Sequence, residues 1–137
     1  MHIKRINHLG IVPKDLAQAK KFFNEILHLN HEGSEVVAEQ KVAVEFLRCE
    51  FSRLELLSPT AEDSPIAKFL ETRGAGIQHI AFEVQNLDNW IDYLKKNNIR
   101  LIDEKPRYGA HNTRIVFVHP HATGGVLVEL VEEQTAV

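Results

Sequence analysis

Two residue types that can hold a metal ion recur in this chain at nearly equal spacing. Glu55 follows His8 by 47 residues, and Glu129 follows His79 by 50 residues. Each histidine stands in a run that reads apolar, polar, His, apolar, small, apolar, and each glutamate stands between aliphatic residues. Two imidazoles and two carboxylates suit a divalent transition-metal ion and leave coordination positions for water or substrate. The spacing therefore predicts one metal site built by two repeated modules.

Taken singly, each of these residues has a simpler explanation. A lone histidine in a strand is more often a hydrogen-bonded structural residue than a ligand, and a lone strand glutamate usually faces solvent. The return of both types at matching places favours the shared metal site. The chain has no CxxC, HExxH or glycine-rich phosphate loop, which argues against a zinc finger, a zincin and the common nucleotide folds.

The elements that must position these residues also repeat. Hydrophobic periodicity predicts a strand, a helix and three strands in each half of one α+β domain. Module one covers about residues 1–58, a linker helix about 64–73, and module two about 76–132. The expected ranges leave one of the three later strands of module one without bounds. They are 2–12 (strand), 15–27 (helix), 29–35 (turn centred on Gly33), 42–47 and 53–57 (strands), 76–84 (strand), 88–97 (helix), 99–103 (strand), 105–112 (loop), 113–119 and 126–131 (strands).

Strand alternation decides which residues share a face of the sheet. Glu55 lies between Leu54 and Leu56, so its side chain points away from both, and Glu129 stands in the same relation to its neighbours. Helices that cover the aliphatic face leave both glutamates and both histidines on the other face. We therefore expect a curved, cup-like mixed sheet with the helices outside and the metal inside.

Composition limits the classes of function. A net charge of −3 over 137 residues argues against a nucleic-acid partner. A single cysteine, Cys49, excludes an intrachain disulfide. No apolar run approaches the roughly 20 residues of a membrane span, and the N-terminus shows no signal-peptide pattern. A cytoplasmic protein without a membrane partner is expected.

Several longer stretches resemble the vicinal oxygen chelate (glyoxalase) superfamily and, within it, the methylmalonyl-CoA epimerases, from about Ile6 to Glu132. They are Glu39–Val42, Leu54–Pro59, Asp63–Glu71, Ile77–Phe82, Leu101–Glu104 and His119–Leu130. The resemblance implies an isomerase that interconverts (R)- and (S)-methylmalonyl-CoA by removing and returning the C2 proton. It also implies a small-molecule CoA thioester as partner, a homodimer, and a divalent ion, with cobalt expected first and nickel, manganese or zinc as alternatives. The implied ligands are His8, Glu55, His79 and Glu129.

The resemblance gives one proton carrier and leaves the other open. Glu129 is the expected base. Some members carry a second acid/base glutamate where this chain has Val44; Glu45 is adjacent, but alternation aims it at the opposite face unless a bulge intervenes. A metal-bound water is the other option. Weaker substrate-binding candidates are Lys105, Arg107, Arg114 and His121, and His121 stands where the family commonly has a lysine.

Two alternatives stay open. Glyoxalase I would use the same four ligands and similar enediolate chemistry on a glutathione hemithioacetal. A non-enzymatic small-molecule binder of the same fold is the other, although such proteins tend to lack the metal ligands. The segments 64–71 and 119–125 favour the epimerase over glyoxalase I.

Overall fold

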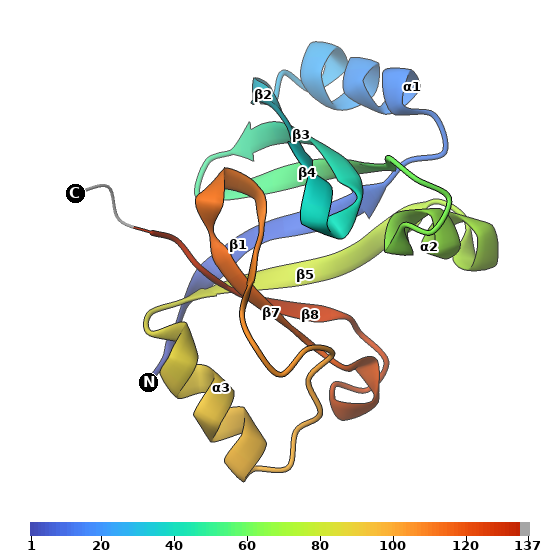
Figure 1. The fold of residues 1–137 in the computed structure, drawn as a ribbon. Coiled ribbons are helices and arrows are strands. Elements are labelled where there is room, and N and C mark those ends of the chain that lie inside the picture. The colour runs from blue at the N-terminus through green and yellow to red at the C-terminus, as the bar shows by residue number, and fades with distance from the viewer. Residues whose placement is uncertain (135–137) are drawn as a thin grey trace. The chain divides into compact units, whose positions relative to one another are not determined.

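The computed structural model describes residues 1–134 and contains the βαβββ pattern twice (Figure 1). This confirms the predicted α+β class. The elements in chain order are β1 (Ile3–Val12), α1 (Leu16–Lys20) with a π-helical continuation (Lys21–Ile26), β2 (Asn30–Val37), β3 (Val42–Cys49), β4 (Ser52–Pro59), α2 (Pro65–Arg73), β5 (Gly76–Val84), α3 (Leu87–Lys96), β6 (Arg107–Tyr108), β7 (Arg114–Val118) and β8 (Val128–Glu132). None of the helices in residues 1–134 is both long enough and apolar enough to cross a membrane.

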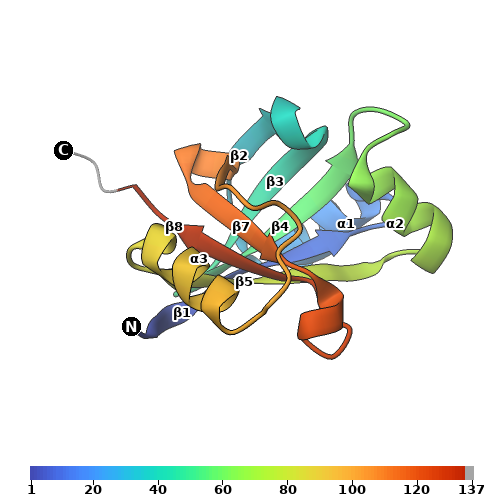
Figure 2. The ribbon, with the colours of Figure 1, turned by 60° about the horizontal axis from the view of Figure 1, so that its bottom comes forward.

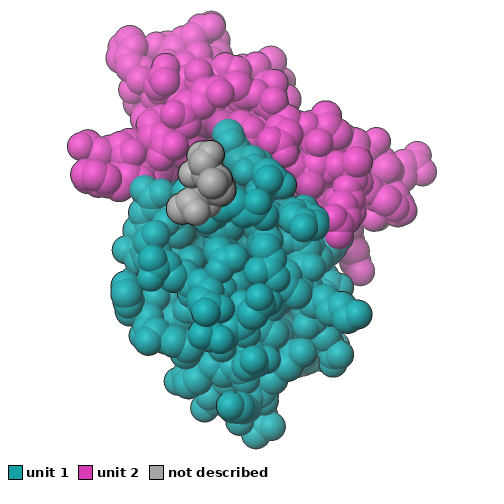
Figure 3. All heavy atoms as spheres, turned by 60° about the vertical axis from the view of Figure 1, so that its left-hand side comes forward, with its two compact units in different colours: residues 1–7, 79–137 teal, residues 8–78 magenta. Residues whose placement is uncertain are grey.

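The described strands are ordered β2-β3-β4-β1-β5-β8-β7-β6. β1 runs parallel to β4 and β5 runs parallel to β8, whereas β2–β3, β3–β4, β6–β7 and β7–β8 are antiparallel. The sheet is therefore mixed. Contacts divide the chain into two compact units, residues 8–78 and residues 1–7 with 79 onward (Figure 3).

In the unit of residues 8–78, the helices begin where the sequence predicts them. The Asp15 carboxylate accepts the Gln18 amide N–H at 3.0 Å, which caps α1. α1 packs against β4. Leu47 and Leu56 are fully buried. Leu47 pairs with Leu54, and Leu54 shares a face with Leu56 because the two are two residues apart on β4, so Leu47 and Leu56 both point to the helix-covered face. The opposite face of β3 and β4, which carries Glu55, is also largely apolar, with Val44, Phe46 and Leu57 buried on it.

The predicted turn at 29–35 is wrong, because residues 30–37 form β2 instead. The pairing of β2 with β3 shifts register between His31 and Gly33, and Gly33 has a φ of +116°. Glycine adopts this conformation without strain, so here it marks an irregularity inside a strand rather than the end of one.

In the other unit, α3 covers one face of β7 and β8 (Figure 2). Leu87 and Ile91 on α3 pack with Val84, Val116 and Leu130 in one buried cluster. The predicted strand at 99–103 is wrong: it makes an isolated bridge between Leu101 and Val118, while the short strand β6 lies inside the predicted loop.

The start of α2 gives a stability prediction. Ser64 is 1% exposed, its Oγ accepts the Ile66 N–H at 3.1 Å, and Pro65 occupies the first helical position. Replacing Ser64 with Ala leaves that N–H without its cap and is expected to lower the free energy of unfolding by about 1 kcal/mol. Urea denaturation measures the change. Thr72→Ala, in the exposed last turn of the same helix, is the control and should stay within about 0.5 kcal/mol; equal losses in the two variants would refute the cap.

Candidate metal centre

The first half of the predicted ligand set lies on β1 and β4. His8 pairs with Arg53 and Gly10 pairs with Glu55 in parallel register, so these four residues share one face. Both ligand candidates are buried, His8 with 5% and Glu55 with 4% of its surface exposed. His8 Nδ1 lies 3.2 Å from Glu55 Oε2. Within residues 8–78, the structure therefore brings together one imidazole and one carboxylate as the sequence predicts.

The Glu55 carboxyl has an unusual electrostatic environment. Burial raises the pKa of Glu55 from its ordinary 4.5 to about 7. The Arg53 guanidinium, 3.5 Å from Glu55 Oε2, opposes this shift, and the Glu35 carboxylate adds to it. Among the described residues, Glu55 Oε2 has no hydrogen-bond partner with acceptable geometry. An oxygen that is buried without such a bond is suited to binding a cation.

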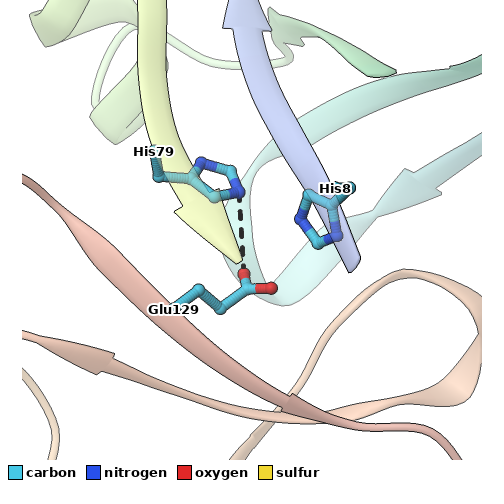
Figure 4. A group of neighbouring side chains, drawn as sticks. All are labelled: His8, His79 and Glu129. Carbon is cyan, nitrogen blue, oxygen red and sulfur yellow. Dashed lines mark ion pairs between the residues drawn. The ribbon is translucent and has the colours of Figure 1, made fainter. Parts of the chain in front are cut away.

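The second half lies on β5 and β8. Ala81 and Phe117 both pair with Glu129, so His79, two residues before Ala81, shares the face of Glu129. The two side chains point toward one another, with His79 Nε2 3.8 Å from Glu129 Oε1 (Figure 4). His79 is 6% and Glu129 4% exposed. The second unit thus repeats the arrangement of the first, with one buried imidazole beside one buried carboxylate.

The protonation state of His79 also suits a ligand. Burial lowers the pKa of His79 from 6.5 to about 4, so the ring is neutral at pH 7 and can offer a nitrogen lone pair. The Phe117 ring meets the imidazole edge-on at a centroid distance of 5.7 Å and limits its movement. A neutral imidazole beside a carboxylate suits a divalent transition-metal ion, which would neutralise the buried negative charge.

The raised pKa of Glu55 predicts how stability changes with pH in the absence of metal. The unfolded carboxyl loses its proton near pH 4.5 and the folded one near pH 7, so the wild type loses stability as the pH rises through this range. The loss amounts to about 3 kcal/mol above pH 7. The Glu55→Gln side chain cannot ionise, so this variant is not expected to lose stability for this reason as the pH rises.

Urea denaturation with a chelator present, from pH 4.5 to 8, measures the difference between wild type and Glu55→Gln. The His79 titration is common to both proteins and cancels in that difference. A difference that does not change with pH would contradict the raised pKa.

Arg53 lies beside the candidate ligands, and the sequence analysis did not single it out. It is 7% exposed, contacts the Glu55 carboxylate, and its guanidinium lies 5.7 Å from the centre of the Phe46 ring. Its position two residues before Glu55 on a strand was the available signal, because such residues share a face. A buried cation on this face favours an anionic ligand.

Glu45 does not reach the face of Glu55. It pairs with Leu56, which points to the helix-covered side. Its carboxylate accepts from Lys20 Nζ at 2.8 Å and lies 3.2 Å from His31 Nε2. Burial alone would raise the pKa of Glu45, but these two partners outweigh it and lower the pKa. No bulge intervenes at this point of β3, so we do not propose Glu45 as the second base.

Of the four substrate-binding candidates, the structure places Arg114 on the other face from Glu129. Arg114 pairs with Glu132, and its guanidinium contacts Asp88 on α3 at 2.9 Å. Arg107 pairs with Ile115, on the Glu129 side of β7, and lies 3.0 Å from Asp103. Lys105 and His121 are exposed.

Comparison with known proteins agrees with this architecture. Residues 7–117 match the Glyoxalase/Bleomycin resistance protein/Dioxygenase superfamily. The uncharacterized protein YqjC of Bacillus subtilis is 40% identical over 95% of this chain and 93% of its own length. The mitochondrial methylmalonyl-CoA epimerase of Homo sapiens is 38% identical over 94% of this chain and 74% of its own.

Among solved structures, a methylmalonyl-CoA epimerase in complex with methylmalonyl-CoA and NH4+ superposes with a TM-score of 0.93 and 34% identity, covering 98% of this chain and 97% of that one. The sequence match and the structural match each extend over nearly the whole chain. The chain therefore belongs to the Glyoxalase/Bleomycin resistance protein/Dioxygenase superfamily, alongside the methylmalonyl-CoA epimerases.

Proposed function

We propose that this protein is a metal-dependent epimerase that interconverts (R)- and (S)-methylmalonyl-CoA. The observation that carries the proposal is a buried His–Glu pair in each unit of a chain that matches methylmalonyl-CoA epimerases over nearly its full length. A protein that only sequesters a ligand has no need for four buried metal-binding side chains, so the pairs also favour an enzyme over a binder.

In this proposal the two pairs hold one divalent ion. His8, His79 and Glu129 are all buried and each offers a ligand atom to such a centre (Figure 4). Glu55, whose carboxylate lies beside His8, would supply the fourth. His8 directly follows Asn7, whose side-chain amide donates to Glu83 on β5 at 2.9 Å. This hydrogen bond joins the start of β1 to β5, the strand that carries His79.

The bound ion would supply a Lewis acid that stabilises negative charge on the thioester carbonyl oxygen. The protein's own residues do the proton transfer. The Glu129 carboxylate accepts the proton of C2, the carbon between the thioester carbonyl and the carboxylate, from one side of the substrate. The C–H electron pair passes into the enolate, and return of a proton to the opposite side inverts C2.

The substrate's charges indicate which residues orient it. Arg53 is buried on the face of His8 and Glu55 and would pair with the substrate carboxylate. Arg107, Lys105 and His121 are the remaining candidates for the CoA part. Cobalt is the ion we expect first, with nickel, manganese and zinc as alternatives, and we expect the protein to act as a homodimer.

Deuterium exchange tests the function directly. Cobalt-loaded protein is mixed with methylmalonyl-CoA in heavy water, and deuterium entry at C2 is followed by mass spectrometry beside a metal-stripped sample. Exchange that is fast and requires the metal is the expected result. Exchange no faster than in the stripped sample, with cobalt bound, would reject the epimerase. The glutathione hemithioacetal of methylglyoxal would then be the next substrate to test.

A further inference from the structure

His119 lies on the face of Glu129, just beyond the end of β7. Phe117 on β7 pairs with Glu129, and His119 follows Phe117 by two residues in an extended conformation, so the three side chains share one face. His119 Nδ1 accepts the backbone N–H of His121 at 3.1 Å. The neutral ring therefore carries its hydrogen on Nε2, which makes His119 a hydrogen-bond donor at neutral pH.

Arg100 lies opposite His119 on a neighbouring segment of the same unit. Leu101 and Val118 form an antiparallel bridge, and the His119 N–H donates to the Arg100 carbonyl at 2.9 Å. Leu101 packs against the buried cluster of α3. Arg100, its neighbour in the chain, therefore points to the other face, which is the face of His119 and Glu129.

This pair of donors has no acidic partner. Within residues 1–134, no carboxylate forms an ion pair or hydrogen bond with Arg100, His119 or His121. Asp103, the nearest acid along the chain from Arg100, is held by Arg107 at 3.0 Å. Loss of contact with water lowers the pKa of His119, and the positive charges of Arg100 and His121 lower it further. An anion bound here would supply the missing negative charge.

The residues beside Glu129 follow the order of groups in a CoA thioester. Alternation places Ile102 beside Phe117, to whose carbonyl its N–H donates at 2.9 Å, and Ile102 is 47% exposed. From Glu129 the face thus presents an apolar row and then the donors His119 and Arg100. Two strand separations and two residues along a strand place the Cα atoms of Glu129 and Arg100 roughly 12 Å apart. The extended pantetheine arm is as long as roughly four residues of chain, about 14 Å, so it spans this separation.

We propose that Arg100 and His119 bind the diphosphate of the CoA substrate. This inference deepens the proposed function and rests on it, because it takes a CoA thioester as the substrate. The Arg100 guanidinium offers paired N–H donors to two phosphate oxygens, and His119 Nε2–H donates to a third. The contact lies far from C2 and is the same in the bound substrate and in the transition state, so it affects KM and leaves kcat unchanged.

A series of substrates separates the diphosphate from the rest of the ligand. The series is methylmalonyl-CoA, its dephospho form, which lacks only the 3′-phosphate, and methylmalonyl-pantetheine, which has no phosphate. Arg100→Ala is expected to raise KM about 10-fold for the two phosphate-bearing substrates at unchanged kcat, the usual effect of losing a charge-assisted hydrogen bond. For the pantetheine thioester, variant and wild type should have the same KM.

Further variants test the parts of the site. His119→Asn keeps a side-chain oxygen that can accept the His121 N–H but has no distal N–H, and it is expected to raise KM for methylmalonyl-CoA about threefold. Arg100→Lys keeps the charge without the paired donors and should recover part of the loss. Lys96→Ala is the matched control, because it removes one exposed positive charge from α3, on the opposite face of β7 and β8. It should behave like the wild type.

Binding without turnover separates this proposal from the function itself. Isothermal titration with CoA and with pantetheine is performed on the wild type and on Arg100→Ala. A preference of the wild type for CoA that is lost in the variant supports the site, even where absent turnover of methylmalonyl-CoA rejects the epimerase. Equal CoA affinity in the two proteins would overturn the site in an active enzyme, as would a KM change that extends to the pantetheine thioester. A KM change that disappears with the dephospho substrate would reject the diphosphate in favour of the 3′-phosphate.

Discussion

Replacing Glu129 with Gln is expected to lower the rate of methylmalonyl-CoA interconversion by roughly 10²- to 10⁴-fold, the usual contribution of a positioned general base. The amide oxygen of the substituted side chain can still bind a metal ion, but the amide does not accept a proton at neutral pH. The side chain is 4% exposed in the wild type and keeps its size in the variant, so the fold should be kept. Cobalt content and C2 exchange are measured on the same sample.

Glu104→Gln is the matched control, since Glu104 is exposed and outside the site. It should interconvert the substrate at the wild-type rate. Full activity in Glu129→Gln with cobalt bound would show that Glu129 is not the base that accepts the C2 proton. Exchange measured on separate diastereomers adds a second criterion, because Glu129→Gln should suppress exchange of the diastereomer that presents its C2 proton to Glu129.

Replacing His79 with Ala is expected to weaken cobalt binding by more than about 10²-fold, which exceeds the usual effect of changing a residue that only orients a ligand. The ring is neutral at pH 7 because its pKa is lowered to about 4, so its nitrogen is available without releasing a proton. The loss of the ring also removes its edge-on contact with Phe117. Isothermal titration with cobalt measures the affinity and the stoichiometry.

His2→Ala is the control for this measurement, because His2 is exposed at the start of the chain. It should bind one cobalt ion per chain with wild-type affinity. If His79→Ala kept the wild-type stoichiometry and affinity for cobalt, His79 would not be a ligand of the ion, and the proposed metal centre would be wrong.

The sequence by itself predicted the repeated βαβββ pattern and the pairs that carry the candidate chemistry. Alternation in Leu54-Glu55-Leu56 was enough to place Glu55 opposite its aliphatic neighbours, because side chains of a strand always point to alternate faces. The same rule predicted that Glu45 would miss the metal face, and the contacts of Glu45 with Lys20 and His31 agree. Local signals also sufficed for Asp15 and Ser64, since helix caps depend on residues only two or three positions apart.

Register across strands was decided only by the tertiary structure. Gly33 looked like a turn, yet it lies in a strand whose irregularity sets the pairing of Glu35 with Val44, and no local pattern encodes a partner nine residues away. Arg114 looked like a substrate-binding cation until its pairing with Glu132 placed it on the helix-covered face. The raised pKa of Glu55 and the lowered pKa of His79 likewise arise from burial by distant segments. Chain order specifies which side chains are available, whereas pairing and desolvation decide which of them face one another and in what charge state.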